Sequence, residues 1–400
     1  MVSVALVVLG GVSATLAALA AYLLALSAAG ILRPMRTPPR STVTHRFAVL
    51  VPAHDEAPVI ERLLRSLQAQ THPRDRFDIY VVADNCTDAT AELARRSGAI
   101  VHERHDPLLR AKGHALRWLL ERVRAHGSYD AYVVFDADSE VAPDFLMRMD
   151  ARLAAGSLVI QSHYRVLNAG DSGAAALREA ALASLHYSRP AGRAALGLSS
   201  GLKGNGMCFA AGVLDRFGWG SVGLAEDVEL HLGLVRRGIR TDFAPEAVVR
   251  ADMPDSVDAA TSQNLRWEAG RLQAVKRDVG PMLVEGILHA RPMVIDAAVE
   301  QLIPPLSVAV SSAIACAILG AVIGSPAIAA MASFAAIGFA GHFMLGLVAV
   351  RAPSRTYRAL LRAPGYVAWK LSLYARAVVS PVSQPWVRTR REQPSTSPKP

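Results

Sequence analysis

Two long stretches without a charged side chain constrain this chain more than any other feature. Val2–Leu32 contains no Asp, Glu, Lys or Arg, and neither does Gln301–Val350. A membrane-crossing helix needs about 20 apolar residues, so the first stretch is long enough for one span. It lacks the basic start and short apolar run of a secretory signal, and we predict that it is retained. Gly324, Ser325 and Pro326 divide the second stretch into two further spans.

Basic residues follow both stretches and indicate how the chain is oriented. They are Arg33, Arg36, Arg40 and Arg46 after the first stretch, and Arg351, Arg355, Arg358 and Arg362 after the second. Three spans with the amino terminus outside put both flanks in the cytoplasm, where Lys and Arg are in excess. The net charge of +9 accompanies 52% hydrophobic and only 19% charged residues, which favours membrane lipids over nucleic acid as a partner. We expect a multi-pass protein of the inner or plasma membrane with a cytoplasmic central region.

Composition divides the chain into seven segments. They are an amino-terminal transmembrane helix (1–32), a basic linker (33–45), a central domain (46–280), an interfacial helix or linker (281–300), two transmembrane helices (301–350), a basic amphipathic interfacial segment (351–388) and a disordered tail (389–400). A fourth span is disfavoured because it would bury Lys370 and Arg376. Cys86, Cys208 and Cys316 have no CxxC spacing, so we expect neither a disulfide framework nor a zinc site.

The central domain begins with four short apolar runs that read as strands. They are Phe47–Val51, Asp78–Ala83, Ile100–His102 and Tyr132–Phe135. Helical patterns separate these runs, and in Val59–Leu67 the apolar residues recur on one helix face. Strands that alternate with amphipathic helices are typical of βαβ units. We therefore predict an α/β domain with a mostly parallel, doubly wound sheet.

Polar side chains follow three of these strands at their carboxyl ends. They are His54, Asp55 and Glu56 after the first strand, Asp84 and Asn85 after the second, and Asp136 and Asp138 after the fourth. Ligands bind at this edge of open α/β sheets, so the pattern predicts a nucleotide site. The sequence has no Gly-rich phosphate loop, which disfavours dinucleotide oxidoreductases and P-loop ATPases. Phosphates would be neutralised by a metal and by basic side chains such as Lys112, unless Lys112 lies exposed in a loop.

Asp136 and Asp138 are the candidate metal ligands. Two carboxylates one residue apart suit a hard divalent cation, which prefers oxygen ligands and can bridge to substrate phosphates. The alternative is structural, with Asp136 opening a loop and Asp138 capping a helix near Val141–Leu153.

Three further groups lie downstream. Gly197–Gly212 is rich in glycine and small residues, which let backbone approach a ligand closely. Glu226 and Asp227 sit at the start of a helical pattern, where charge at the helix dipole would explain them without chemistry. Gln263, Arg266 and Trp267 share one face of a helix expected near residues 258–276. That face suits a diphosphate and a sugar ring, or else belongs to an ordinary helix at the membrane interface.

Together these residues resemble the family 2 glycosyltransferases, in particular the membrane-embedded branch with cellulose, hyaluronan and poly-N-acetylglucosamine synthases. The resemblance runs from about Arg46 to Trp267. It rests on the order of a DxD motif at Asp136-Ala137-Asp138, the pair Glu226-Asp227 and a QxxRW motif ending at Trp267, followed by apolar helices. It implies a GT-A-like domain with a doubly wound mixed sheet, joined to an α-helical transmembrane region of about three spans and to interfacial helices.

The resemblance also implies a role for each matching residue. Asp84 and Asn85 would contact the uracil or ribose of a UDP-sugar, in a pocket lined by Pro52, Ala53, His54 and Glu56. Asp136 and Asp138 would hold UDP and Mg²⁺ or Mn²⁺, with Lys112 near the diphosphate. Asp227 would be the general base, paired with Glu226. The residues that would bind the diphosphate and the acceptor sugar are Gly204, Asn205, Gly206, Gln263, Arg266 and Trp267.

The implied activity is that of an inverting hexosyltransferase, since a single base and in-line attack invert the anomeric centre. The expected acceptor is a growing cell-surface polysaccharide. Because the spans are few, the alternative is the addition of one sugar to a lipid-linked acceptor. Other polysaccharide-synthesis or export subunits are candidate partners. A catalytically silent membrane scaffold is a remote further alternative.

Overall fold

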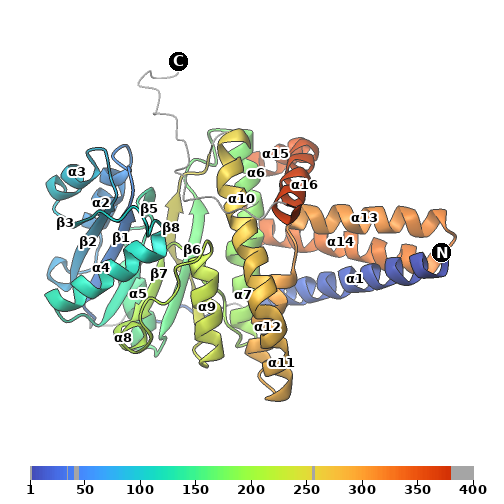
Figure 1. The fold of residues 1–400 in the computed structure, drawn as a ribbon, viewed down its shortest axis with the longest axis horizontal. Coiled ribbons are helices and arrows are strands. Elements are labelled where there is room, and N and C mark those ends of the chain that lie inside the picture. Colours follow the sequence, from blue (N-terminus) through green and yellow to red (C-terminus); the bar gives the residue numbers. More distant parts are fainter. Residues whose placement is uncertain (1, 34, 40–44, 255–256, 380–400) are drawn as a thin grey trace.

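The computed structural model describes residues 2–33, 35–39, 45–254 and 257–379, so the expected disordered tail at 389–400 lies outside the described residues. A mixed sheet of eight strands, in the order β3-β2-β1-β4-β7-β6-β8-β5, forms one end of the molecule. Helices flank this sheet, and three apolar helices project from the opposite end (Figure 1).

The first half of the sheet is parallel, as predicted. It contains β1 (Phe47–Ala53), β2 (Phe77–Asp84), β3 (Ile100–Arg104) and β4 (Ala131–Val134), with α2 (Ile60–Gln68), α3 (Thr90–Arg96) and α4 (Lys112–His126) between them. Successive side chains of a strand point to opposite faces. Val49 therefore packs with Leu63 of α2 in one core, and Leu50 packs with Leu116 of α4 in the other.

The second half makes the sheet mixed. It contains β5 (Ser139–Val141), β6 (Val159–Val166), β7 (Met207–Ala210) and β8 (Thr241–Ala251), with α5 (Phe145–Ala154), α8 (Ala211–Phe217) and α9 (Glu226–Arg236). β7 is antiparallel to both β4 and β6, whereas β6 and β8 are parallel. The helix expected near Val141–Leu153 begins only at Phe145, and β5 lies between it and Asp138. Asp138 therefore does not cap that helix, and the structural alternative for this residue is wrong.

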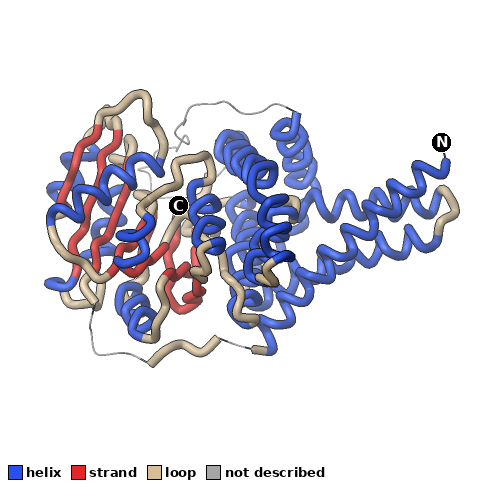
Figure 2. The backbone as a smooth tube through the Cα atoms, turned by 60° about the horizontal axis from the view of Figure 1, so that its bottom comes forward, coloured by secondary structure: helices blue, strands red, loops and turns tan. Residues whose placement is uncertain are grey.

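A layer of helices lies between the sheet and the apolar helices (Figures 1 and 2). It contains α6 (Gly173–Ala183), the π-helical turn η2 (Ser184–Ser188), α7 (Arg189–Ala195), α10 (Val257–Ala274), α11 (Gly280–Leu288), α12 (Pro292–Leu302), α15 (Ser354–Ala359) and α16 (Ala363–Val379). Lys370 of α16 binds Asn264 and Glu268 of α10, at 2.8 and 3.0 Å. The charge of Lys370, one of the two that disfavour a fourth span, is thus paired inside the protein.

The apolar stretches form α1 (Val2–Leu32), α13 (Leu306–Val322) and α14 (Pro326–Ala349). They pack together through a shared apolar core, and the start of α1 lies at the same far end as the turn between α13 and α14 (Figure 1). Val4–Leu32 and Pro326–Ala349 are each long and apolar enough to cross a membrane. A third span results if α12 and α13, which meet at a bend of 74°, count as one broken helix. Two to three spans agree with the expected number of about three.

Close contacts join α1 to the helical layer. A Cβ on Gly192 of α7 would lie 2.2 Å from the carbonyl oxygen of Leu26, so only glycine permits the two backbones to approach this closely. His342 of α14 is hydrogen-bonded through one ring nitrogen to Ser27 and through the other to Ser184 of η2, at 2.7 and 2.6 Å. The α/β part of the molecule and the apolar helices are therefore one packed unit.

Candidate active site

The three predicted loops meet because β1, β2 and β4 are parallel and end at the same edge of the sheet. They border a cavity of about 1020 Å³, called the central cavity below, which continues toward α10, α13, α14 and α16. Every predicted site residue lines this cavity except Asn205 and Gly206. The lining residues are Pro52, Ala53, His54, Glu56, Asp84, Asn85, Lys112, Asp136, Asp138, Gly204, Glu226, Asp227, Gln263, Arg266 and Trp267.

Asp84 is held in place at the end of β2. Nη1 of Arg104, at the end of β3, donates to Oδ1 of Asp84 at 2.5 Å, and the Asn85 amide donates to the same oxygen at 3.1 Å. Nδ1 of His54 donates to the Asp84 carbonyl at 2.6 Å. Asp84 is thus fixed in orientation at the wall of the cavity. Arg104 was not among the predicted residues, because its contact with Asp84 depends on the register in which β2 and β3 pair.

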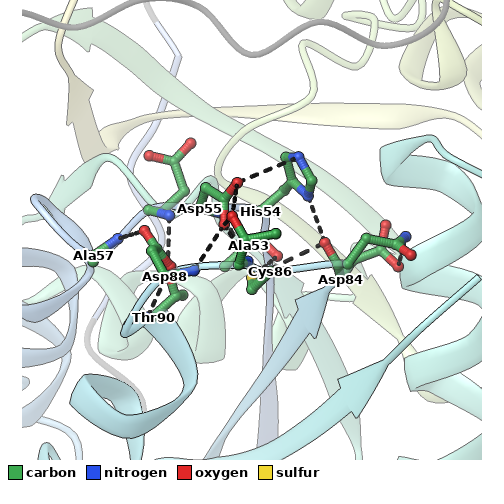
Figure 3. Close-up of polar contacts among 11 residues, drawn as sticks. Ala53, His54, Asp55, Ala57, Asp84, Cys86, Asp88 and Thr90 are labelled. Atoms are coloured by element: carbon green, nitrogen blue, oxygen red, sulfur yellow. Dashed lines mark hydrogen bonds and ion pairs between the residues drawn. The ribbon is translucent and has the colours of Figure 1, made fainter. Parts of the chain in front are cut away.

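The loops after β1 and β2 are tied together beneath this part of the wall (Figure 3). Asp55, Cys86 and Asp88 form a cluster in which a metal ion would find three ligand atoms. The Asp55 carboxylate instead accepts the backbone N–H groups of Thr87 and Asp88, at 2.6 and 3.2 Å. Burial raises the pKa of the Cys86 thiol to about 11, which disfavours the thiolate that binds metals. This cluster therefore serves to fix the two loops.

Lys112 is the first residue of α4 and lies between three oxygen groups. Its ammonium donates to the Asp136 carboxylate and to the Gly204 carbonyl, and lies 3.6 Å from Oε1 of Glu226. Burial alone would lower the pKa of Lys112, but the carboxylates of Asp136 and Glu226 outweigh it and the pKa is raised. Lys112 is therefore a fixed cation at the DxD motif, and the alternative of an exposed loop residue is wrong.

Glu226 and Asp227 are the first two residues of α9, and the carboxylates of both lie near the Lys112 ammonium. Oδ1 of Asp227 accepts the N–H of Val228 at 2.9 Å, so this carboxylate also satisfies one donor of the helix start. Burial raises the pKa of both acids, and the charge of Lys112 opposes the rise. A carboxyl group with a raised pKa beside a cation is suited to accepting a proton.

Asn205 and Gly206 lie behind the wall and support it. Oδ1 of Asn205 accepts the N–H of Asp136 at 3.2 Å, and its amide nitrogen donates to Ser139 at 2.9 Å. Gly206 has a φ of +65°, and a Cβ there would lie 2.0 Å from the Ser162 hydroxyl oxygen. In this structure both residues shape the DxD turn rather than border the cavity.

Gln263, Arg266 and Trp267 of α10 close the cavity on the side opposite the sheet edge. Trp267 is 43% exposed, so its ring has a free face. Burial lowers the pKa of Arg266, and the carboxylates of Glu226 and Asp136 counteract this effect. The Arg266 guanidinium is thus a cation that faces the acidic groups across the cavity. The central cavity is thus lined by carboxylates, by the cations Lys112 and Arg266, and by the indole ring of Trp267.

The chain is similar to known glycosyltransferases in sequence. The model of "Glycosyltransferase like family 2" matches residues 45–270. The probable glycosyltransferase YdaM of Bacillus subtilis is 25% identical over 245 residues, which are 58% of this chain and 56% of the relative. The beta-monoglucosyldiacylglycerol synthase of Synechocystis is 26% identical over 252 residues, 60% of this chain and 51% of the relative. The chain thus spans about half the length of these curated relatives.

A solved structure shares the fold over nearly the whole chain. It is the mannosyltransferase PcManGT from Pyrobaculum calidifontis in complex with GDP-Man and Mn²⁺, with a TM-score of 0.58 and 20% identity. The similarity covers 93% of this chain and 99% of that one, so it includes apolar helices as well as the GT-A-like sheet. Since the family model matches more than half of the chain, the protein belongs to glycosyltransferase family 2 and is a glycosyltransferase.

Proposed function

We propose that the protein is an inverting, membrane-bound transferase that takes its sugar from a UDP-sugar, with Asp227 as the general base. The observation that carries this proposal is the meeting of Lys112, Asp136 and Asp227 at Gly204. A Cβ on Gly204 would lie 3.5 Å from Oδ2 of Asp227 and 3.6 Å from the Lys112 nitrogen. A proton acceptor and a phosphate-binding cation thus border the same small space.

The proposed reaction uses these groups in one displacement. The acceptor hydroxyl gives its proton to Asp227 while its oxygen forms a bond to the anomeric carbon of the donor. The bond from that carbon to the diphosphate breaks, and its electron pair leaves with UDP. Lys112 and Arg266 stabilise the charge that develops on the departing diphosphate. Asp84 orients the nucleotide from the other end of the site.

Asp136 and Asp138 would hold a divalent metal, Mg²⁺ or Mn²⁺. Both are oxygen donors on the cavity wall, and the ion pair between Asp136 and Lys112 indicates that positive charge is stabilised there. When bound, such an ion neutralises charge on the leaving diphosphate. The complex of PcManGT with GDP-Man and Mn²⁺ supports a metal and a nucleotide-sugar donor.

The acceptor distinguishes two candidates. A growing cell-surface polysaccharide, made by a multi-pass membrane protein with its catalytic domain in the cytoplasm, stays the prediction from the sequence. Addition of one sugar to a lipid-linked acceptor is favoured by a specific observation, the continuation of the central cavity to Val310 of α13 and Phe343 of α14. The relative named a beta-monoglucosyldiacylglycerol synthase is consistent with this second candidate.

Purified protein in detergent tests the proposed reaction. With a panel of UDP- and GDP-sugars and Mn²⁺ or Mg²⁺, we expect release of UDP that EDTA abolishes. Asp227→Asn should lower turnover at least about a hundredfold, because the proton acceptor is lost while the shape is kept. Asp215→Asn is the matched control, since Asp215 pairs with Arg124 at 3.0 Å outside the cavity. Full turnover in Asp227→Asn would exclude the assigned base, and turnover with GDP-sugars alone would exclude the UDP donor.

A further inference from the structure

The central cavity changes character beyond the acidic pair of α9. Toward the sheet edge its walls carry the polar residues of the donor site. On the other side the lining includes apolar side chains from the projecting helices, among them Leu306 and Val310 of α13 and Phe339 and Phe343 of α14. A glycan chain that contacted these apolar side chains would leave hydroxyl groups without partners, at a cost in free energy. A hydrocarbon chain fits them.

Lys203 lies where the two parts of the cavity meet. It immediately precedes Gly204, and its ammonium folds back over Gly201, 3.4 Å from where a Cβ on that glycine would lie. Its backbone N–H is bonded to Gln161. Within the part of the chain that the structure describes, the Lys203 ammonium itself has no hydrogen bond or ion pair. A cation that lines a cavity without a partner is an unused binding group for an anion.

Lys203 lies among other charged side chains. Arg193 binds Asp296 at 2.9 Å and also Glu300, and Arg189 lies 3.6 Å from the same Glu300 carboxylate. Nε of Arg189 is buried without a hydrogen-bond partner among the described residues. Arg189, Arg193 and Lys203 lie near the carboxylates of Asp296 and Glu300, and the Asp227 carboxylate also acts on Lys203. Burial lowers the pKa of Lys203, and Glu300 and Asp227 only partly offset this effect, so a bound anion would be stabilised there.

We propose that Lys203, with Arg189, binds the phosphate of a lipid-linked acceptor whose head group carries the hydroxyl that is glycosylated. The order of groups along the cavity matches such a molecule. Asp227 faces the hydroxyl, Lys203 faces a phosphate or diphosphate, and α13 and α14 contact the hydrocarbon chain. This inference rests on the proposed function, because it assigns the acceptor for the same reaction. The reaction itself is unchanged: the hydroxyl oxygen bonds to the anomeric carbon, its proton goes to Asp227, and UDP leaves.

The first experiment identifies the class of product. Full-length protein in detergent is given the radiolabelled donor found active above, together with a total lipid extract, a polyprenyl-diphosphate-linked sugar or a soluble oligosaccharide. We expect label in the organic phase that binds to an anion-exchange column and is released by mild acid. Label in a neutral lipid, in a soluble glycan or only in free sugar would overturn the proposal. Absence of any donor turnover would instead contradict the proposed function.

The second experiment tests Lys203 itself. Lys203→Met should raise the KM for the anionic lipid at least about tenfold, while Lys203→Arg keeps the charge and should retain most of the affinity. Binding of UDP, measured by calorimetry, reports separately on the donor site. Lys276→Met is the matched control, because Lys276 is exposed and does not line the cavity. An unchanged KM in Lys203→Met, or an equal loss in Lys203→Arg, would overturn the assignment.

Discussion

Lys112 determines the charge of the acidic pair at the start of α9. Burial raises the pKa of Asp227, and the nearby ammonium of Lys112 limits that rise. The proposed general base, Asp227, must be deprotonated to act, so on this proposal turnover falls as the pH drops through the pKa of Asp227. Because this pKa is raised, the loss occurs at a higher pH than for an exposed aspartate.

Removal of the Lys112 charge should therefore move the acid limb of the pH–rate profile. In Lys112→Met the carboxylates lose the cation that favours their charged form, and we expect the limb to shift upward by about one pH unit. The shift is read from kcat against pH, independently of the lower overall rate expected from weaker diphosphate binding. A limb that stays in place, or moves to lower pH, would show that Lys112 does not control the base.

Residues with one local signal were predictable, and residues that act through partners were not. Asp136, Asp138 and Asp227 could be found because carboxylates follow a strand or open a helix at recognisable positions. Arg104 and Lys203 were missed because each depends on a pairing that the sequence does not display. Arg104 matters through its contact with Asp84, and Lys203 through the absence of such a contact among the described residues.

At the scale of elements, the parallel half of the sheet was predictable and the mixed half was not. β1, β2 and β4 are continuous apolar runs, because a strand buried on both faces needs apolar side chains on both. β5 and β7 have only three and four residues, and β6 and β8 carry polar and charged residues. Short or polar strands give no clear periodicity, so their pairing depends on tertiary contacts. The sequence likewise suggested that Asn205 and Gly206 touch ligand, whereas they support the turn.

Substitution of Gly206 tests whether this residue supports the turn at the DxD motif. In Gly206→Ala the methyl group would meet the Ser162 hydroxyl at 2.0 Å in a backbone with positive φ, so the segment that leads into β7 must shift. We expect a loss of roughly 2 kcal/mol or more in the free energy of unfolding, together with weaker donor binding. Gly212→Ala in α8 is the control, with nothing within 4 Å and ordinary helical backbone. Equal thermal stability of the two variants would contradict this role.

At the scale of the molecule, the apolar helices were predictable from composition, but their docking was not. Charge-free stretches identify α1, α13 and α14 by themselves. Their attachment depends on Gly192 facing Leu26 and on His342 between Ser27 and Ser184, which are single residues without a periodic pattern. The fold is therefore a catalytic domain whose position relative to the apolar helices is fixed by a few close contacts.

Gly192→Ala tests this attachment. Alanine favours the helix itself by up to about 1 kcal/mol, so any loss of stability reports the clash with α1 rather than α7. We expect a net loss of about 1–3 kcal/mol, measured by thermal unfolding in detergent, because the Leu26 carbonyl must move away. Gly11→Ala on α1 is the control, with open space around its Cβ. Unchanged stability in both variants would mean that α1 is only loosely attached.

Because the central cavity is continuous from the sheet edge to the apolar helices, the concentrations of donor and acceptor would have to be expressed in different ways. One part of the cavity is bordered by the sheet edge and the other by apolar helices. A donor dissolved in water and an acceptor dissolved in lipid would then be counted in different units, moles per litre for one and mole fraction of the surrounding lipid for the other. Inert lipid or detergent would dilute the acceptor without changing the volume of the sample. Saturation by the donor would depend on its concentration in the solution volume, whereas saturation by the acceptor would depend on its density in the membrane plane.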